Sequence, residues 1–297
     1  MSAKHVALYG LGNMGYLVAE RIARQFPLHV ADLDQVAVGK AQSNLGAEPI
    51  QQPEDLARVD VVVLCLPSPA ASQAVLAQIA PHLSADAVVV ETSTVNPADV
   101  QASARILAKF GIAMVDASIM AGVSQMATGT AMLLVGGEDT ALAACEDVLA
   151  AISDKRIYFG PPGAGAAAKV INNAVAHAVM VVVAEAGSMA TAAGVDCEKL
   201  VGLLSDKQMG LHRPLTHRYA ERIMQGNYEG GMPLEAARKD SVLALELAQS
   251  LQVPLFAIQA AHTAYDIALR SGYGRDDYAA VAKIWADWGR PASPAER

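Results

Sequence analysis

The chain has 297 residues, of which 53% are hydrophobic and 18% are charged, and its formal net charge is −8. This composition is typical of a globular protein and excludes an intrinsically disordered chain. The negative charge, together with the lack of any run of Lys or Arg in the sequence, argues against a nucleic-acid partner. The length is sufficient for one large domain or two medium domains with a sizeable buried core.

The cysteines indicate a reducing compartment. Cys65, Cys145 and Cys197 have no CxxC spacing and belong to no Cys/His cluster, so the sequence predicts no metal site. A sparse, odd number of thiols fits a compartment where they stay free, and the N-terminus does not resemble a signal peptide. We therefore expect a cytoplasmic protein.

One apolar segment, at 174–187, is long enough to raise the question of a membrane span. Lys169, His177 and Glu185 interrupt the apolar sequence around it, and it is shorter than about 20 uninterrupted apolar residues. We interpret it as a buried helix of a soluble protein and expect no membrane partner.

The first part of the chain alternates apolar runs with amphipathic helical patterns. The runs are rich in Val, Leu and Ile, which is typical of parallel strands covered on both faces. The order strand, helix, strand predicts right-handed crossovers and an α/β fold, a Rossmann-type doubly wound sheet, over residues 1–162. The predicted strands are 5–10, 27–32, 59–67, 87–93, 113–118 and 131–137.

Strand patterns stop after residue 163. Residues 164–194 predict one long helix that ends near Gly194, and further helical stretches separated by turns follow it. The Gly/Pro-rich segment 160–165 marks the boundary. We therefore expect an all-α domain at 163–297 that begins with a long interdomain helix and serves substrate binding and oligomerisation. The Pro- and Ala-rich tail at 290–297 is expected to be loose.

The sequence GLGNMG has the G-x-G-x-x-G spacing and lies between a predicted strand and a predicted helix. In such a loop the first glycine permits a tight turn, the second admits a pyrophosphate, and the third permits close packing of helix on strand. The helix N-terminus then offers free amides to the phosphates. The predicted cofactor loop comprises Gly10, Leu11, Gly12, Asn13, Met14 and Gly15. The alternative is a glycine-rich turn in an α/β protein without a ligand.

Asp32 follows Gly10 by 22 residues and ends the next predicted strand. This spacing is close to that of the carboxylate that holds the ribose hydroxyls of a dinucleotide. A carboxylate there repels a 2'-phosphate, so the sequence favours NAD over NADP. Asp34 is the nearby alternative, and we expect it to be a solvated loop residue.

Gly165, Lys169 and Asn173 stand at i, i+4 and i+8 and so share one face of the predicted long helix. Gly165 adds no side chain where we expect that face to meet a ligand. Partial burial of Lys169 among its apolar neighbours would favour its neutral form and bring it into the range of a general base. The alternatives are a surface lysine with a solvated amine and a structural asparagine.

Several longer motifs agree in pointing to one family. They are GLGNMG (10–15), LCLPSP (64–69), ETSTVNP (91–97), DASIMAGV (116–123), GTAMLLVGG (129–137), GAGAAAKVINN (163–173) and ARKDSVLALELA (237–248). Over nearly its whole length the chain resembles the 3-hydroxyisobutyrate dehydrogenase family, the β-hydroxyacid dehydrogenases related to 6-phosphogluconate dehydrogenase.

The resemblance implies an NAD-dependent oxidoreductase that transfers a hydride between nicotinamide and a 3-hydroxyacid, or the matching semialdehyde or keto acid. It implies that Lys169 is the catalytic lysine that exchanges a proton with the substrate hydroxyl, and that Asn173 orients the substrate. Imine reductases share the architecture but usually have a proton donor other than a lysine at this position. A catalytically silent dinucleotide-binding protein is the other alternative, and the presence of both residues argues against it.

Further cofactor residues follow from the resemblance by position. Leu66 and Pro67 match residues that pass under the adenosine and the nicotinamide ribose, and Thr94 matches a residue on the nicotinamide side. Lys239 matches a lysine that reaches the cofactor from the second domain, with Asp240 as its partner. The alternatives are a proline that ends a strand, a helix N-cap and a surface ion pair.

The sequence departs from the family at the expected substrate pocket. Where many relatives have Ser-Gly-Gly to hold the substrate carboxylate, this chain has Met120, Ala121 and Gly122, and Met232 stands where relatives often have Phe. Backbone amides can still bind an anion, but Met120 is larger, apolar and flexible. We expect an altered substrate specificity; the alternative is that Met120 is a core residue.

Two further expectations concern the second domain. His212 and Arg213 lie where a substrate anion could be bound, against the alternative of solvated polar residues. The long helix at 164–194 has more apolar surface than one small helical domain covers, and in the resembling family such helices pack against a partner subunit. We therefore expect a homodimer or homotetramer.

Overall fold

The computed structural model describes residues 4–286 and 288. The chain divides into two compact units, unit 1 (Met1–Ala174) and unit 2 (Val175–Arg297). The tail at 290–297 lies outside the described residues.

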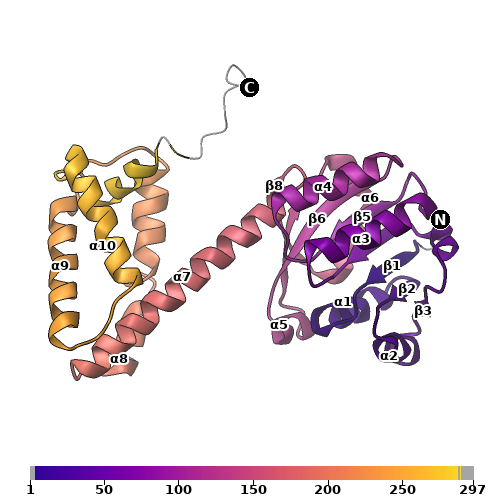
Figure 1. Cartoon of the computed structure of the whole chain (residues 1–297), viewed down its shortest axis with the longest axis horizontal. Coiled ribbons are helices and arrows are strands. Elements are labelled where there is room, and N and C mark those ends of the chain that lie inside the picture. Colours follow the sequence, from indigo (N-terminus) through magenta and orange to yellow (C-terminus); the bar gives the residue numbers. More distant parts are fainter. Residues whose placement is uncertain (1–3, 287, 289–297) are drawn as a thin grey trace, which may run out of the picture. The chain divides into compact units, whose positions relative to one another are not determined.

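Unit 1 is built on one eight-stranded sheet of order β3-β2-β1-β4-β5-β6-β7-β8 (Figure 1). Neighbouring strands are parallel except β6 and β7, which are antiparallel. The strands are β1 (Val6–Tyr9), β2 (Leu28–Ala31), β3 (Glu48–Pro49), β4 (Val61–Leu64), β5 (Val88–Glu91), β6 (Ala113–Met120), β7 (Met132–Gly136) and β8 (Lys155–Gly160).

The six predicted strands are present, and the expected α/β class is confirmed, with a Rossmann-type sheet followed by helices. The sequence did not predict β3 and β8. It predicted β7 as a strand but not its antiparallel direction. The connection from β6 to β7 is only 121–131, which is too short for the crossover of a dozen or more residues that parallel neighbours need.

Helices cover both faces of the sheet. Alternate residues of β1 enter two different cores: Val6 and Leu8 pack with α1 and α6, whereas Ala7 packs with α3 and α4. The helical elements of unit 1 before α7 are α1 (Asn13–Ala23), α2 (Gln35–Leu45), α3 (Pro69–Ile79), α4 (Pro97–Ala108), α5 (Val123–Ala127) and α6 (Asp139–Ile152), with 3₁₀ turns η1 (Pro53–Arg58) and η2 (Ala80–His82).

The predicted long helix is α7 (Ala164–Ala192), and Gly194 just beyond it has a φ of +73°. The described part of unit 2 is otherwise helical, apart from a single bridge between Pro233 and Asp277. Its elements are α8 (Cys197–Ser205), η3 (Pro214–Ile223), α9 (Leu234–Ser250), α10 (Ala257–Ala268), η4 (Leu269–Tyr273) and η5 (Tyr278–Trp285).

The expected burial of segment 174–187 is wrong for the single chain. Val175, Met180 and Val181 are exposed, and within this segment only Glu185 is buried. By length and composition alone α7 could also cross a membrane, a test that core helices of water-soluble proteins pass as well. Contiguous exposed apolar side chains are typical of surfaces that pack against another molecule.

Candidate active site

The glycine loop follows β1, which lies between β2 and β4 at the point where the strand order reverses. Gly10 has a φ of +100°, and a Cβ on it would lie 2.1 Å from the Cys65 carbonyl oxygen. A Cβ on Gly15 would lie 2.0 Å from the Gly10 carbonyl oxygen. These two glycines are therefore required by the packing of the strand, the turn and the first helix.

Gly12 differs from the other two glycines, because a Cβ on it would meet nothing within 4 Å. It is the N-cap of α1 and offers no side chain to the helix amides. This open space lies at the start of α1, where the amides of the first turn, including those of Asn13 and Met14, form the positive end of the helix dipole. This is a cradle that a side chain would fill and that fits the pyrophosphate of NAD.

Asp32 lies just after β2 and points to the glycine loop. Its carboxylate accepts hydrogen bonds from the Leu11 amide at 2.5 Å and from the Asp34 amide at 2.8 Å. Asp34 is exposed, as expected, but it also has a structural function, since its carboxylate accepts from the Val36 amide and caps α2. A 2'-phosphate here would face two carboxylates, whereas a ribose diol could donate to Asp32.

The other predicted cofactor residues of unit 1 lie beyond the ends of β4 and β5, at the same edge of the sheet as the glycine loop. The Leu66 amide donates to the Ser93 hydroxyl at 2.8 Å, which joins the two strand ends. Pro67 and Thr94 are exposed. Ligands bind at this edge in open α/β sheets.

The start of α7 is fixed to the sheet by Asp116. This buried carboxylate of β6 accepts hydrogen bonds from the amides of Gly163 and Ala166, both at 2.6 Å. A Cβ on Gly165 would lie 2.3 Å from the Leu134 carbonyl oxygen of β7. The expectation that Gly165 makes room for a ligand is therefore wrong: the glycine permits close packing of α7 on the sheet.

Lys169 lies about one turn beyond Ala166 on α7, and Met120 lies four residues beyond Asp116 on the same face of β6. The two side chains meet, with the Lys169 amine 3.6 Å from the Met120 sulfur. Lys169 is buried, and this burial lowers its pKa from the ordinary lysine value. A thioether is a weak acceptor, so it does not oppose the shift as a carboxylate would.

A cavity of about 360 Å³ opens beside Lys169 in unit 1. Lys155 and Lys169 line it together with uncharged polar and apolar side chains, and none of the described residues that line it is acidic. The residues relevant here are Met120, Gly122, Gln125, Met132, Lys155 and Lys169. Sequence reasoning placed Lys169, Met120, Ala121 and Gly122 in the pocket, and it missed Gln125, Thr130, Met132 and Lys155.

Gly122 donates its amide to the Gln125 side-chain oxygen at 2.6 Å. The amide that was expected to bind a substrate anion therefore already has an oxygen acceptor. The neighbouring asparagines also differ from one another. Asn172 donates to the Met120 sulfur at 3.4 Å, while the predicted residue, Asn173, is half-buried.

The remaining predicted residues lie in unit 2. Lys239 is exposed on α9 and pairs with Asp240 at 3.1 Å. His212 is exposed, and Arg213 is half-buried and donates to the Gln208 carbonyl oxygen. Met232 is half-buried just before α9. Their roles in cofactor or substrate binding stay predictions.

Comparison with known proteins gives matches along almost the whole chain. The model of the NAD binding domain of 6-phosphogluconate dehydrogenase matches residues 5–160. The model described as NAD-binding of NADP-dependent 3-hydroxyisobutyrate dehydrogenase matches residues 163–285.

L-threonate dehydrogenase from Cupriavidus necator is 30% identical to this chain, over 95% of this chain and 96% of its own length. Human mitochondrial 3-hydroxyisobutyrate dehydrogenase is 28% identical, over 93% of this chain and 85% of its own. The structure of an imine reductase from Bacillus cereus is similar with a TM-score of 0.84 at 17% identity, covering 96% of this chain and 99% of that one. This last likeness shows a shared fold alone.

Proposed function

Because the chain belongs to the 3-hydroxyisobutyrate dehydrogenase family, we propose that Lys169 is the general acid and base of its reaction. The protein is an NAD-dependent oxidoreductase that acts on the hydroxyl group of hydroxyacids. The observation on which the role of Lys169 rests is its buried amine, with a lowered pKa, in the wall of a cavity without acidic groups.

NAD supplies the hydride acceptor of the reaction when it is bound. The residues of this chain that would hold it are the amides of Gly12, Asn13 and Met14 for the pyrophosphate and the Asp32 carboxylate for the ribose. Leu66 and Thr94, at the ends of the next two strands, contact the ribose and the nicotinamide side.

Lys169 holds the proton of the reaction. In oxidation, its neutral amine removes the proton of the substrate hydroxyl as the hydride leaves the same carbon. In reduction, the protonated amine returns that proton to the carbonyl oxygen. Burial lowers the pKa of Lys169 and so makes the neutral form that oxidation needs easier to reach than for an ordinary lysine.

The amides of Ala121 and Gly122 and the side chain of Asn173 orient the substrate. The Gln125 oxygen that now accepts from the Gly122 amide occupies the place of a carboxylate oxygen. A substrate carboxylate replaces it, and the Gln125 amide group is then available as a donor. Met120, next to Lys169, sets which hydroxyacids fit.

The test of this proposal is Lys169→Ala. Loss of a positioned acid–base group is expected to reduce kcat by about 10²–10⁴-fold, because that is the usual contribution of such a group. NAD affinity, measured by fluorescence titration, should stay within a few fold. Lys109→Ala, at the exposed C-terminal end of α4, is the matched control and should retain full activity. Unchanged turnover by Lys169→Ala would refute the assignment.

The same assay distinguishes the two alternative functions. A panel of 3-hydroxyacids, aldehydes and cyclic imines is followed by NADH absorbance. Turnover of imines but not of hydroxyacids would identify an imine reductase. Tight NAD binding without turnover of any of them would identify a silent dinucleotide-binding protein.

A homodimer or homotetramer also belongs to this proposal. Ile171, Val175, Met180 and Val181 of α7 are exposed in the single chain. In water these side chains favour burial against another surface, and a second copy is the partner that is always present. Multi-angle light scattering at micromolar concentration should give two or four chains per particle. A monomer would contradict the proposal.

We also place the protein in the cytoplasm. Cys65, Cys145 and Cys197 are all free thiols, which is typical of a reducing compartment. Detection of the protein after cell fractionation tests this location, and recovery with the membranes would contradict it.

A further inference from the structure

A second lysine, Lys155, lines the cavity beside Lys169, and the family resemblance gave it no role. Lys155 is the first residue of β8, a strand that the sequence did not predict. Met120 pairs with Met132 across β6 and β7, and Met132 pairs with Lys155 across β7 and β8. Directly opposed residues project from the same face of a sheet, so these three side chains form one row.

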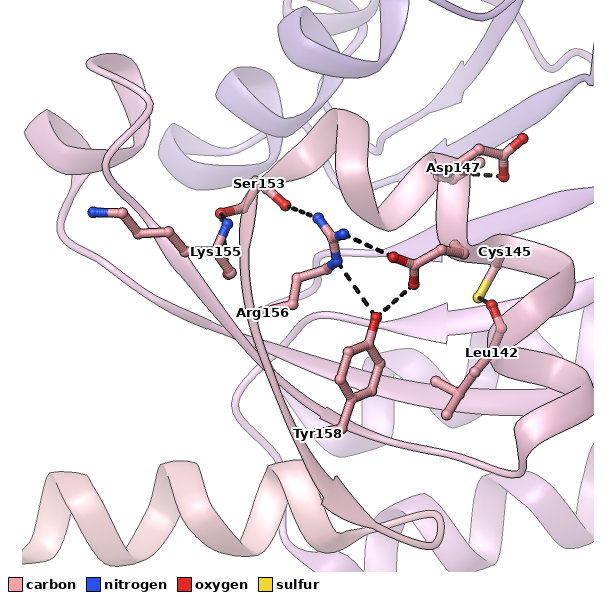
Figure 2. Close-up of polar contacts among 9 residues, drawn as sticks. Leu142, Cys145, Asp147, Ser153, Lys155, Arg156 and Tyr158 are labelled. Carbon is pink, nitrogen blue, oxygen red and sulfur yellow. Dashed lines mark hydrogen bonds and ion pairs between the residues drawn. The ribbon is translucent and has the colours of Figure 1, made fainter.

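Alternation along β8 separates Lys155 from its neighbours. Arg156 and Tyr158 lie on the opposite face, where both bind the Glu146 carboxylate of α6. Figure 2 shows the Lys155 side chain extending away from Arg156 and Tyr158. Over the part of the chain that the structure describes, no carboxylate lies within ion-pair distance of the Lys155 amine, whereas Arg156 is paired with Glu146 at 2.7 Å.

The backbone at Lys155 is held firmly. The buried Ser153 hydroxyl donates to the Ala131 carbonyl oxygen at 2.7 Å and accepts from the Lys155 amide at 3.1 Å. The start of β8 is thereby tied to the residue just before β7. The amine of Lys155 is thus attached to a fixed point of the cavity wall and not to a free loop.

Two lysines line one cavity in which no described residue is acidic, within a chain of net charge −8. Such a site concentrates anions. A single carboxylate bound at the Gly122 amide could pair with Lys169 but not with Lys155. Lys155 lies two strands from Met120, so their backbones are about 10 Å apart. Met120 and Met132 between them provide a flexible apolar floor that suits a short methylene chain.

We propose that Lys155 binds a second anionic group of the substrate, so that the site is selective for 3-hydroxyacids with a distal carboxylate on a short side chain. This proposal rests on the proposed function of Lys169, because it assumes that the substrate hydroxyl lies at Lys169 and the first carboxylate at Gly122. Gln125, released from the Gly122 amide, and Thr130 are the uncharged donors on the same wall.

The test uses three 3-hydroxypropanoates that carry at C2 a propyl, a 2-carboxyethyl or a 2-carbamoylethyl group. The second and third have nearly the same shape and differ in charge. The wild-type protein is expected to turn over the 2-carboxyethyl compound with a kcat/KM about tenfold above that of the amide, as expected for one hydrogen bond to a charged group. A wild-type protein without this preference would overturn the proposal.

Lys155→Gln should remove this preference through KM, with kcat within threefold and with the propyl and amide compounds unaffected. Lys109→Gln makes the same change of net charge on an exposed part of α4 and should behave as the wild type. An equal loss of kcat/KM for all three compounds would show that Lys155 only supports the fold of the cavity wall. An unchanged preference for the 2-carboxyethyl compound would show that Lys155 does not contact the substrate.

A binding measurement keeps this proposal separate from that for Lys169. Glutarate, glutaramate and pentanoate correspond to the three substrates without the hydroxymethyl group, and they are titrated calorimetrically into the NAD complex. Glutarate should bind about tenfold more tightly than glutaramate to the wild type and to Lys169→Ala, but not to Lys155→Gln. Equal binding of the two by the wild type overturns the role of Lys155 even if Lys169→Ala abolishes turnover. Glutarate selectivity that depends on Lys155, together with full turnover by Lys169→Ala, overturns only the role of Lys169.

Discussion

The Lys169 amine lies 3.6 Å from the Met120 sulfur and is buried beside the cavity. A serine at this position would offer the lysine a hydroxyl in place of a sulfur. A thioether accepts hydrogen bonds only weakly and cannot donate one. Met120 therefore covers the amine without stabilising its charge, and the lowered pKa of Lys169 follows from burial alone.

The pH dependence of the reaction should show this directly. Oxidation needs the neutral amine, so its kcat/KM is expected to rise with pH to a plateau, with a midpoint below the ordinary lysine pKa of about 10.4. Reduction needs the protonated amine, so its kcat/KM should fall as the pH rises through the same midpoint. Both profiles are measured by NADH absorbance, and in Lys169→Ala this midpoint should disappear. If kcat/KM rose with pH in both directions, or fell in both, a single group could not act as base in oxidation and as acid in reduction.

Met120→Ser should change the specificity and leave the chemistry intact. The serine hydroxyl can donate to a substrate carboxylate, so the KM for 3-hydroxyisobutyrate is expected to fall up to about tenfold, the effect of one hydrogen bond to a charged group. The smaller side chain also leaves Lys169 more solvated, so the midpoint of the oxidation profile should move upward. Met132→Ser alters the neighbouring position of the same row and is the control. It should not move the midpoint, because the described contacts of the Lys169 amine are with Met120.

The three glycines of the cofactor loop should respond differently to alanine. A Cβ on Gly15 would lie 2.0 Å from a backbone oxygen, so Gly15→Ala is expected to destabilise unit 1 by about 1–3 kcal/mol or more. Gly12→Ala meets open space in the apoprotein and should leave the melting temperature within a few degrees, while the Kd for NAD rises at least about tenfold because the methyl group enters the pyrophosphate cradle. Differential scanning fluorimetry and NAD titration measure the two effects.

Gly39→Ala is the control for the glycine series, since Gly39 lies inside α2 and a Cβ there also meets nothing within 4 Å. It should bind NAD normally and be slightly more stable, because alanine favours a helix over glycine by up to about 1 kcal/mol. Normal NAD affinity of Gly12→Ala would show that the pyrophosphate does not lie against this loop.

Local patterns were sufficient for most of unit 1. The six predicted strands are buried apolar runs, and the turn at Gly10 needs a residue that accepts a φ of +100°. β8 was missed for a physical reason: it is an edge strand whose Ile157, Tyr158 and Phe159 are exposed, and its mixed polar and apolar residues have neither a continuous apolar run nor strict alternation.

The composition of the cavity wall could not be predicted because it depends on pairing between distant segments. Lys155 reaches the row of Met120 and Met132 only through the register of β6, β7 and β8. The contact of Asn172 with the Met120 sulfur depends on the rotation of α7 about its axis, since neighbouring helix positions differ by about 100°. Neither register nor helix rotation is specified by the residues of one segment.

Glu185 is a buried acid of α7 in unit 2. Its carboxylate accepts from the amides of Phe256, Ala257 and Ile258, the first of which donates at 2.6 Å, and it thereby satisfies the N-terminus of α10. Burial by itself would raise the pKa of Glu185, but these three donors outweigh it and the pKa lies below the ordinary value. A group with a depressed pKa stabilises the folded state above its unfolded pKa, of about 4.3 for glutamate, and this contribution is lost as the pH falls through the lower folded pKa.

Glu185→Gln keeps the shape of the side chain but loses the charge and one acceptor oxygen. It should therefore lower the free energy of unfolding of unit 2 by about 1–3 kcal/mol at pH 7. As the pH falls below the unfolded pKa of about 4.3, the difference from the wild type should shrink, because the carboxylate progressively loses its contribution to the folded state. Thermal unfolding at pH 7 and at pH 3 measures both. Glu246→Gln, an exposed acid of α9, is the control and should be nearly neutral at both values. A stability difference for Glu185→Gln that is the same at both pH values would assign its effect to shape and not to the charge at the helix terminus.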